Sequence, residues 1–108
     1  MIRFLVACWL LLPGLLLRAE GRDFKAFFQA RCSVCHGLDG SGQSSRGIRL
    51  GARNLASSKW TREDEGELVA SVLRGRGAMP GFQRQLSEAE ARRLLAEVVR
   101  PMATRRKS

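Results

Sequence analysis

The chain lacks tyrosine altogether and has only one histidine, three cysteines and three prolines in 108 residues. Aromatic residues make up 6% of the chain, so few rings are available to fill a core. Acidic residues are also scarce, with 10 Asp and Glu against 19 Lys and Arg, which gives a formal net charge of +9. The length allows one domain at most, and so small a domain usually needs a covalent cross-link or a cofactor to complete its core.

The N-terminal segment has the order of a secretory signal peptide. Arg3 provides a positive charge, and an apolar run from Phe4 to Leu17 follows it. The small residues Ala19 and Gly21 then fit the positions before a cleavage site. The run is too short to span a bilayer core of about 30 Å as a helix. We therefore expect the mature protein to begin at Arg22 and to be exported to the periplasm, with an uncleaved signal anchor as the alternative.

Cys8 lies inside this apolar run, in a sequence similar to the cleavage site of bacterial lipoproteins. Too few residues precede Cys8 and the run continues after it, so we reject lipidation. The sequence is thus divided into a signal peptide, residues 1–21, and one domain, residues 22–108, with a short basic C-terminal tail. Two cysteines remain in the domain, so at most one disulfide could form there.

Hydrophobic spacing predicts an all-α domain of three main helices joined by glycine-rich loops. The first helix is expected from about Asp23 to Cys35, and a loop is expected over residues 37–58. A second helix, capped by the hydroxyl of Thr61, is expected to end at Arg74. After a loop over residues 76–85, a third helix is expected to begin at a capping box.

That capping box consists of Ser87 and Glu90, whose side chains can each accept a backbone N–H of the first turn. An apolar stripe follows, and we expect Pro101 to end the helix at Arg100. The remaining residues, from Met102 onward, are expected to form a frayed basic tail.

Cys32, Cys35 and His36 form the sequence C-x-x-C-H, which is typical of covalent haem c attachment. Two thiols three residues apart on one helical turn can each add to one of two vinyl groups on neighbouring pyrroles. His36, the only histidine of the chain, is then held over the iron as the proximal ligand. These three residues predict one covalently bound haem c.

Three other interpretations of the same residues were weighed against this one. A thioredoxin-like redox pair expects a βαβ context, which the spacing does not indicate. A zinc site needs four ligands, whereas the mature chain supplies three from cysteine and histidine. A disulfide between Cys32 and Cys35 would close too small a loop to stabilise the protein much.

Met79 is predicted to be the sixth ligand of the iron. The other methionine of the domain, Met102, follows a helix-ending proline, where we expect no fixed position in the core. Met79 is flanked by glycines, which let the backbone approach a porphyrin, and by Pro80, which stiffens the loop. The alternative is that Met79 merely fills a gap in the core.

These residues resemble the small bacterial class I cytochromes c. The resemblance is carried by C-x-x-C-H near the N-terminus and by Gly-Ala-Met-Pro-Gly-Phe, residues 77–82, and it covers nearly all of residues 22–100. Residues 50–55 also look like the haem-edge segment of that family. The resemblance implies a cytochrome c fold in which helices and glycine-rich loops wrap around one covalently bound haem.

The sequence departs from the family in one respect. Members often have a proline after C-x-x-C-H whose carbonyl accepts the Nδ1–H of the proximal histidine. No proline lies between His36 and Met79, so the acceptor is unidentified, and backbone carbonyls of residues 47–51 are the candidates. Trp60, Arg49 or Arg53 are further candidates for contacts to the haem propionates.

The resemblance implies a periplasmic carrier of single electrons and not an enzyme, since two protein ligands leave no open position on the iron. One alternative is a haem subunit that is an obligate part of a dehydrogenase or oxidase complex. Another is a haem enzyme or gas sensor with a labile sixth ligand.

The positive charge predicts the chemistry of the partner. Arg74, Arg76 and Arg84 flank the Met79 loop, so we expect a redox partner with an acidic docking surface. Nucleic acid is not expected, because an exported protein seldom meets it. Membrane contact is expected only through a partner complex or an uncleaved anchor.

Overall fold

The computed structural model describes residues 22–105, and over this range the protein is built from helices with no β-strand. The prediction of an all-α fold is confirmed. The predicted signal peptide with Cys8, and the last residues of the basic tail, lie outside the described residues. No helix in the described part of the chain has the length and apolar character to cross a bilayer. The elements, in order, are α2 (Phe24–Phe27), η4 (Phe28–Cys32), α3 (Ser33–His36), α4 (Ser45–Leu50), η5 (Ser58–Arg62), α5 (Glu65–Arg74), α6 (Glu88–Leu94), η6 (Leu95–Val99) and α7 (Arg100–Arg105).

The first predicted helix is present as three segments, α2, η4 and α3, that follow one another without a break. The Asp23 carboxylate accepts the Ala26 N–H and caps the start, and Gly37 ends the run with a positive φ of 82°. Phe24 and Phe28, four residues apart on one face, are buried. The middle segment is π-helical, so the turn before Cys32 is wider than an α-turn.

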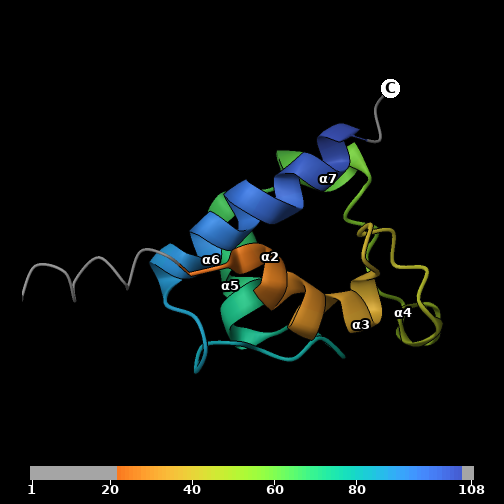
Figure 1. The fold of residues 1–108 in the computed structure, drawn as a ribbon, viewed down its shortest axis with the longest axis horizontal. Helices are drawn as coiled ribbons and strands as arrows, with labels where there is room; N and C mark the ends of the chain where they lie inside the picture. Colours follow the sequence, from red (N-terminus) through yellow and green to blue (C-terminus); the bar gives the residue numbers. More distant parts are fainter. Residues whose placement is uncertain (1–21, 106–108) are drawn as a thin grey trace, which may run out of the picture.

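The C-terminal helix crosses this first run and closes the core. Figure 1 shows α6 and α7 as one blue rod lying across α2, with α5 behind them. The predicted capping box is confirmed: the Ser87 hydroxyl accepts the Glu90 N–H, and the Glu90 carboxylate accepts the Ser87 N–H. The largest fully buried side chains, Phe28 and Leu94, come from these two crossing runs.

The predicted end of this helix at Arg100 is wrong, because helix continues through Pro101 to Arg105. The stretch before it, η6, is π-helical, and the backbone pattern changes to α at Arg100. Pro101 directly follows this change, and because it has no N–H it donates no bond to the preceding turn. Met102, expected in a frayed tail, is instead buried with 5% of its surface exposed.

Two further expectations are corrected between the long helices. The expected loop over residues 37–58 contains a short helix, α4, which the Ser44 hydroxyl caps by accepting the Gly47 N–H. The second long helix, α5, begins at Glu65 and is capped by the Asp64 carboxylate. Thr61 lies earlier, in the 3-10 helix η5, where its hydroxyl donates to the Ser58 carbonyl.

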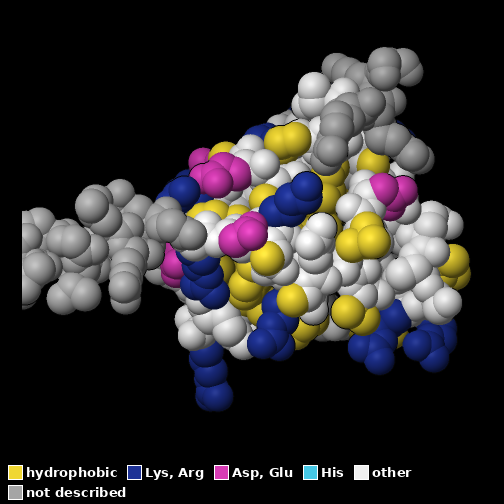
Figure 2. All heavy atoms as spheres, in the orientation of Figure 1, with side chains coloured by type: hydrophobic (Ala, Val, Ile, Leu, Met, Phe, Trp, Pro, Cys, Tyr) yellow, Lys and Arg dark blue, Asp and Glu magenta, His cyan; other side chains and the backbone are white. Residues whose placement is uncertain are grey.

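Charge is unevenly distributed over the surface. Five glutamates pair with arginines, mostly on α5 and the C-terminal helix, at Arg22–Glu90, Arg53–Glu63, Arg92–Glu65, Arg92–Glu88, Arg93–Glu97 and Arg100–Glu65. In Figure 2 the charged side chains visible along the lower edge of the molecule are Lys and Arg, and Figure 1 places α3 and α4 at the right-hand part of this edge. Exposed pairs of this kind contribute little to stability, about 0–1 kcal/mol each, so their main effect is on the electric field.

Candidate haem-binding site

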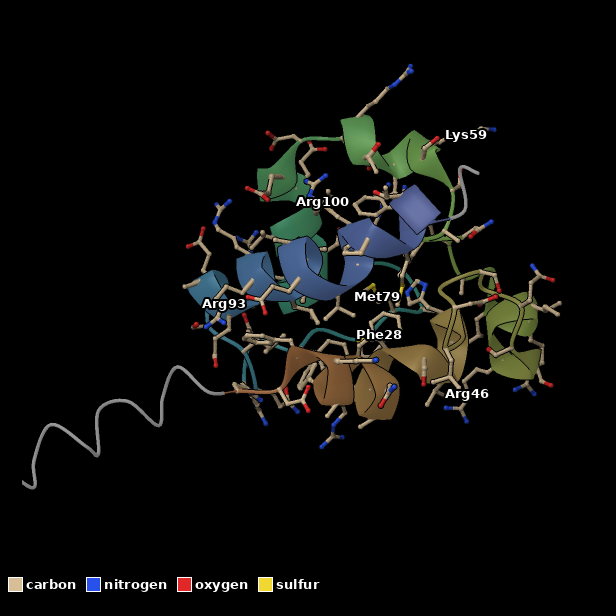
Figure 3. All side chains as sticks on the ribbon, turned by 45° about the horizontal axis from the view of Figure 1, so that its top comes forward. Phe28, Arg46, Lys59, Met79, Arg93 and Arg100 are labelled. Carbon is tan, nitrogen blue, oxygen red and sulfur yellow. The ribbon has the colours of Figure 1, made fainter. Side chains whose placement is uncertain are left out.

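A cavity of about 490 Å³ lies inside the helical framework, and all four predicted site residues contribute to its wall. Cys32, Cys35 and His36 reach it from the first helical run, and Met79 reaches it from the loop after α5. Figure 3 shows Met79 in the interior, between the C-terminal helix and the segment that carries Phe28. Met102 does not line the cavity. The structure therefore brings together the residues that sequence analysis selected.

His36 is fixed in orientation by a backbone carbonyl. The Arg53 oxygen lies 3.0 Å from Nδ1 of His36, so this nitrogen carries the hydrogen and Nε2 is left as the donor for a metal. Burial lowers the pKa of His36, with a smaller opposing effect of the hydrogen bond that His36 donates to the Arg53 carbonyl. At neutral pH the imidazole is therefore neutral, which is the form that binds iron.

The acceptor is thus outside the range 47–51 that the sequence indicated. α4 ends at Gly51, whose φ of 71° and ψ of 39° turn the chain back toward the haem-attachment helix. On the opposite side Gly42 permits close packing, since a Cβ there would lie 2.7 Å from the Ala52 oxygen and 3.2 Å from the Arg53 oxygen. Two glycines therefore allow the path of the chain that places the Arg53 carbonyl beside His36.

The two cysteines are unpaired and half-buried. Burial raises the pKa of Cys32 to about 11, so this sulfur is a neutral thiol at physiological pH. Within residues 22–105 no three His, Cys, Asp or Glu side chains are grouped as a metal site needs, which argues against zinc. The absence of a strand over the same residues argues against a thioredoxin-like pair.

The Met79 loop is held by its backbone. Arg76 and Met79 exchange two N–H···O bonds of 3.0 Å, which closes a tight turn around Gly77, with a φ of 58°. The chain then lies against the end of α5, because the Phe82 N–H donates to the Val72 carbonyl at 2.9 Å. Met79 is half-buried in this turn, so its thioether faces the cavity from a fixed backbone.

The three predicted propionate contacts are not assembled as expected. Trp60 lines the cavity, but its indole N–H donates to the Leu55 carbonyl at 2.6 Å, so this donor is already used. Arg53 also lines the cavity, and its guanidinium pairs with Glu63. Arg49 does not contribute to the cavity wall.

We expect Trp60→Phe to lower the free energy of unfolding by about 1–3 kcal/mol, because the Leu55 carbonyl loses its donor in a buried position. Urea unfolding followed by circular dichroism measures this. An unchanged midpoint would show that water replaces the indole donor at no cost.

The residues around the cavity fit a haem. Its volume lies in the range of about 300–1,000 Å³ that is usual for cofactor sites. Phe28, Trp60 and Leu94 are among the mostly apolar side chains of its wall. Besides three arginines and a serine, that wall carries two thiols, one imidazole and one thioether, which are the groups of covalent attachment and axial ligation of iron.

Comparisons with known proteins find similarity to c-type cytochromes. No curated protein matches the chain. Among solved structures, one described as "KustC0563 c-type cytochrome" is similar with a TM-score of 0.65 and 28% sequence identity, and the match covers 75% of this chain and 98% of that one. The sequence model of the family described as "Cytochrome C oxidase, cbb3-type, subunit III" matches residues 19–96. The chain therefore belongs to this family of c-type cytochromes, which are electron-transfer haem proteins.

Proposed function

We propose that this chain is a periplasmic monohaem cytochrome c that passes single electrons between redox partners and is not an enzyme. Cys32 and Cys35 attach the haem, His36 is the proximal ligand and Met79 is the sixth ligand. The observation that carries the proposal is the convergence of these four residues, from two separate segments, on one apolar cavity. The bound haem supplies an iron that accepts and releases one electron.

The protein's own residues suit this role because backbone contacts position the two proposed axial ligands. The Arg53 carbonyl fixes the His36 ring, and the paired backbone bonds of Arg76 and Met79 fix the thioether. A thioether ligand favours ferrous iron and so raises the reduction potential relative to a second histidine. The apolar wall excludes water and lowers the local dielectric, which tunes the same potential.

The absorption spectrum of the purified mature protein in both oxidation states tests this function. We expect a low-spin spectrum in both states, and haem that stays with the chain on a denaturing gel. Intact mass should give a chain beginning at Arg22 with one haem added. A high-spin ferrous form, or haem that separates from the chain, would contradict the proposal.

A second candidate is a haem subunit within a larger complex, and the cbb3-type subunit III family favours it. The two candidates differ in how the protein purifies from its source. A free carrier elutes as a monomer by gel filtration, whereas a subunit co-purifies with an oxidase and needs detergent.

Unpaired positive charge lies around the cavity. Arg74, Arg76 and Arg84 are exposed on both sides of the Met79 loop, and none of them forms an ion pair with residues 22–105. Arg31 and Arg76 also line the cavity mouth. A positive field of this kind steers an oppositely charged protein toward the haem.

We therefore expect electron transfer to an acidic redox protein to be faster at low ionic strength, by about 10–10³-fold relative to an uncharged encounter. At 0.15 M salt the Debye length is about 8 Å, so much of the gain is screened. Stopped-flow rates across an ionic-strength series measure this. A rate that is flat or rises with added salt would exclude electrostatic docking.

A further inference from the structure

Large hydrophobic side chains are exposed at one place only among the described residues. Val34 is 47% exposed, Leu38 71%, Ile48 63% and Leu50 49%. All four lie on α3, on α4 or just after α3, and these two helices pack against each other. We call this group, together with Arg46 and Arg49, the α3–α4 surface.

α4 packs closely against α3, and this packing leaves the apolar side chains of the α3–α4 surface exposed. Gly47 is buried against the haem-attachment turn, where an added Cβ would overlap the Cys35 carbonyl oxygen. The Ser44 hydroxyl donates to the carbonyls of Val34 and Cys35, at 2.7 and 2.9 Å. Because α4 contacts α3 through a glycine and a serine, its larger side chains are left on the outside.

Both charged residues of α4 are arginines, and one exposed carboxylate, Asp39, lies beside Leu38 at the edge of this surface. Arg46 and Arg49 are exposed, and neither forms an ion pair with any residue in the range 22–105. Figure 3 places Arg46 at the outer edge of the molecule, away from the C-terminal helix that carries several of the glutamates. Figure 2 shows hydrophobic side chains near the basic ones at this end. An apolar centre flanked by arginines is the composition of a protein interface.

The same surface borders the cavity. Cys35 and His36, which line the cavity, belong to α3, and Leu50 at the end of α4 lies both on the cavity wall and at the surface. A protein seated here would be separated from the cavity by little more than the α3 turn and Leu50.

We propose that the α3–α4 surface is the contact surface for an acidic redox protein, whose own apolar patch covers Leu38 and Ile48. The proposal rests on the proposed electron-transfer function and specifies where its partner binds. A second copy of this chain is not the occupant, since it would bring the same arginines face to face. A lipid surface is not favoured either, because α4 has six residues and presents no aromatic side chain.

The occupant can be identified by photo-crosslinking in the organism that encodes the chain. A p-benzoylphenylalanine residue is placed at Ile48 in the full-length chain, and in a control strain at Lys59, which Figure 3 shows on the other side of the molecule from Arg46. We expect a crosslink from position 48 to an acidic haem, copper or flavin protein, and none to that protein from position 59. A crosslink to lipid or to a second copy, equal crosslinking from both positions, or no crosslink from position 48 would overturn the proposal.

The captured protein is then purified and its electron-transfer rate is measured at 0.15 M salt, where distant charges are screened. Ile48→Ser and Leu38→Ser are each expected to slow the transfer about tenfold, since each removes a side chain that docking would bury. Arg46→Gln should slow electron transfer more than Arg84→Gln does. Arg84→Gln is the matched control, because it removes the same charge beside the Met79 loop. Unchanged rates in the serine variants, or an equal loss in the two glutamine variants, would show that docking occurs elsewhere.

Spectra and potentials of the same variants separate this proposal from the underlying function. Neither Leu38 nor Ile48 lines the cavity, so reversible reduction and the low-spin spectrum should match those of the unmodified protein. A normal spectrum with unchanged rates in the serine variants refutes only the α3–α4 surface. Failure of the unmodified protein to take up and release an electron refutes the function itself.

Discussion

Met79→Ala is expected to leave the haem attached and to open the iron to external ligands. In the proposed site Cys32 and Cys35 attach the haem, whereas Met79 would contribute only the sixth bond. The weak near-infrared charge-transfer band of methionine ligation should disappear, and the ferrous protein should bind carbon monoxide. The reduction potential should fall, because the thioether no longer stabilises ferrous iron.

Met102→Leu is the matched control, because Met102 is the other methionine among the described residues. It is buried against Gly40, where an added Cβ would lie 2.7 Å from its sulfur, and it does not line the cavity. Leucine is close to methionine in volume, so stability should change by less than about 1.5 kcal/mol. The near-infrared band should be retained. If the band survives in Met79→Ala and is lost in Met102→Leu, the assignment of the sixth ligand is wrong.

The candidate site could be predicted from the sequence because its chemistry depends on local spacing. Cys32, Cys35 and His36 are close together on one helical turn, and Met79 lies directly before Pro80 in a stretch flanked by glycines. The contact partner of His36 could not be predicted in this way. The Arg53 carbonyl lies beside His36 because of the path that the chain takes between Gly42 and Gly51. Every residue has a backbone carbonyl, so the residue type at position 53 does not identify it as the acceptor.

The long helices could be predicted because each buries an apolar stripe. α4 could not, because Gly47 makes its close contact with α3 while Ile48 and Leu50 are 63% and 49% exposed, so its hydrophobic spacing indicates no buried face. Pro101 was misleading for a different reason. A proline usually ends an α-helix because it lacks an N–H, but here the α-segment that begins at Arg100 directly follows a π-helical turn, and the helix continues past the missing donor.

Gly47→Ala is expected to destabilise the protein, against the usual preference of a helix. In an exposed helix the change from glycine to alanine stabilises by roughly 1 kcal/mol. Here the new methyl group would overlap the Cys35 carbonyl and lie 2.7 Å from the Gly42 oxygen, both of which are backbone atoms that cannot rotate away. Overpacking of this kind costs about 1–3 kcal/mol or more, and relief requires α4 to move off the haem-attachment turn. We therefore expect a net loss of about 2 kcal/mol in urea unfolding of the haem-loaded protein.

Gly51→Ala is the comparison that separates packing from backbone strain. Gly51 has a positive φ of 71°, but a Cβ there would meet no atom within 4 Å. Gly51→Ala should therefore cost only the strain of a non-glycine residue in the left-handed conformation, about 1–2 kcal/mol. It should not displace α4. The two variants also differ in what they disturb: movement of α4 would weaken the Ser44 bonds to the turn that holds Cys35, so only Gly47→Ala should lower the yield of attached haem. If Gly47→Ala proves as stable as the unmodified protein, α4 does not pack on Cys35, and the α3–α4 surface loses its structural basis.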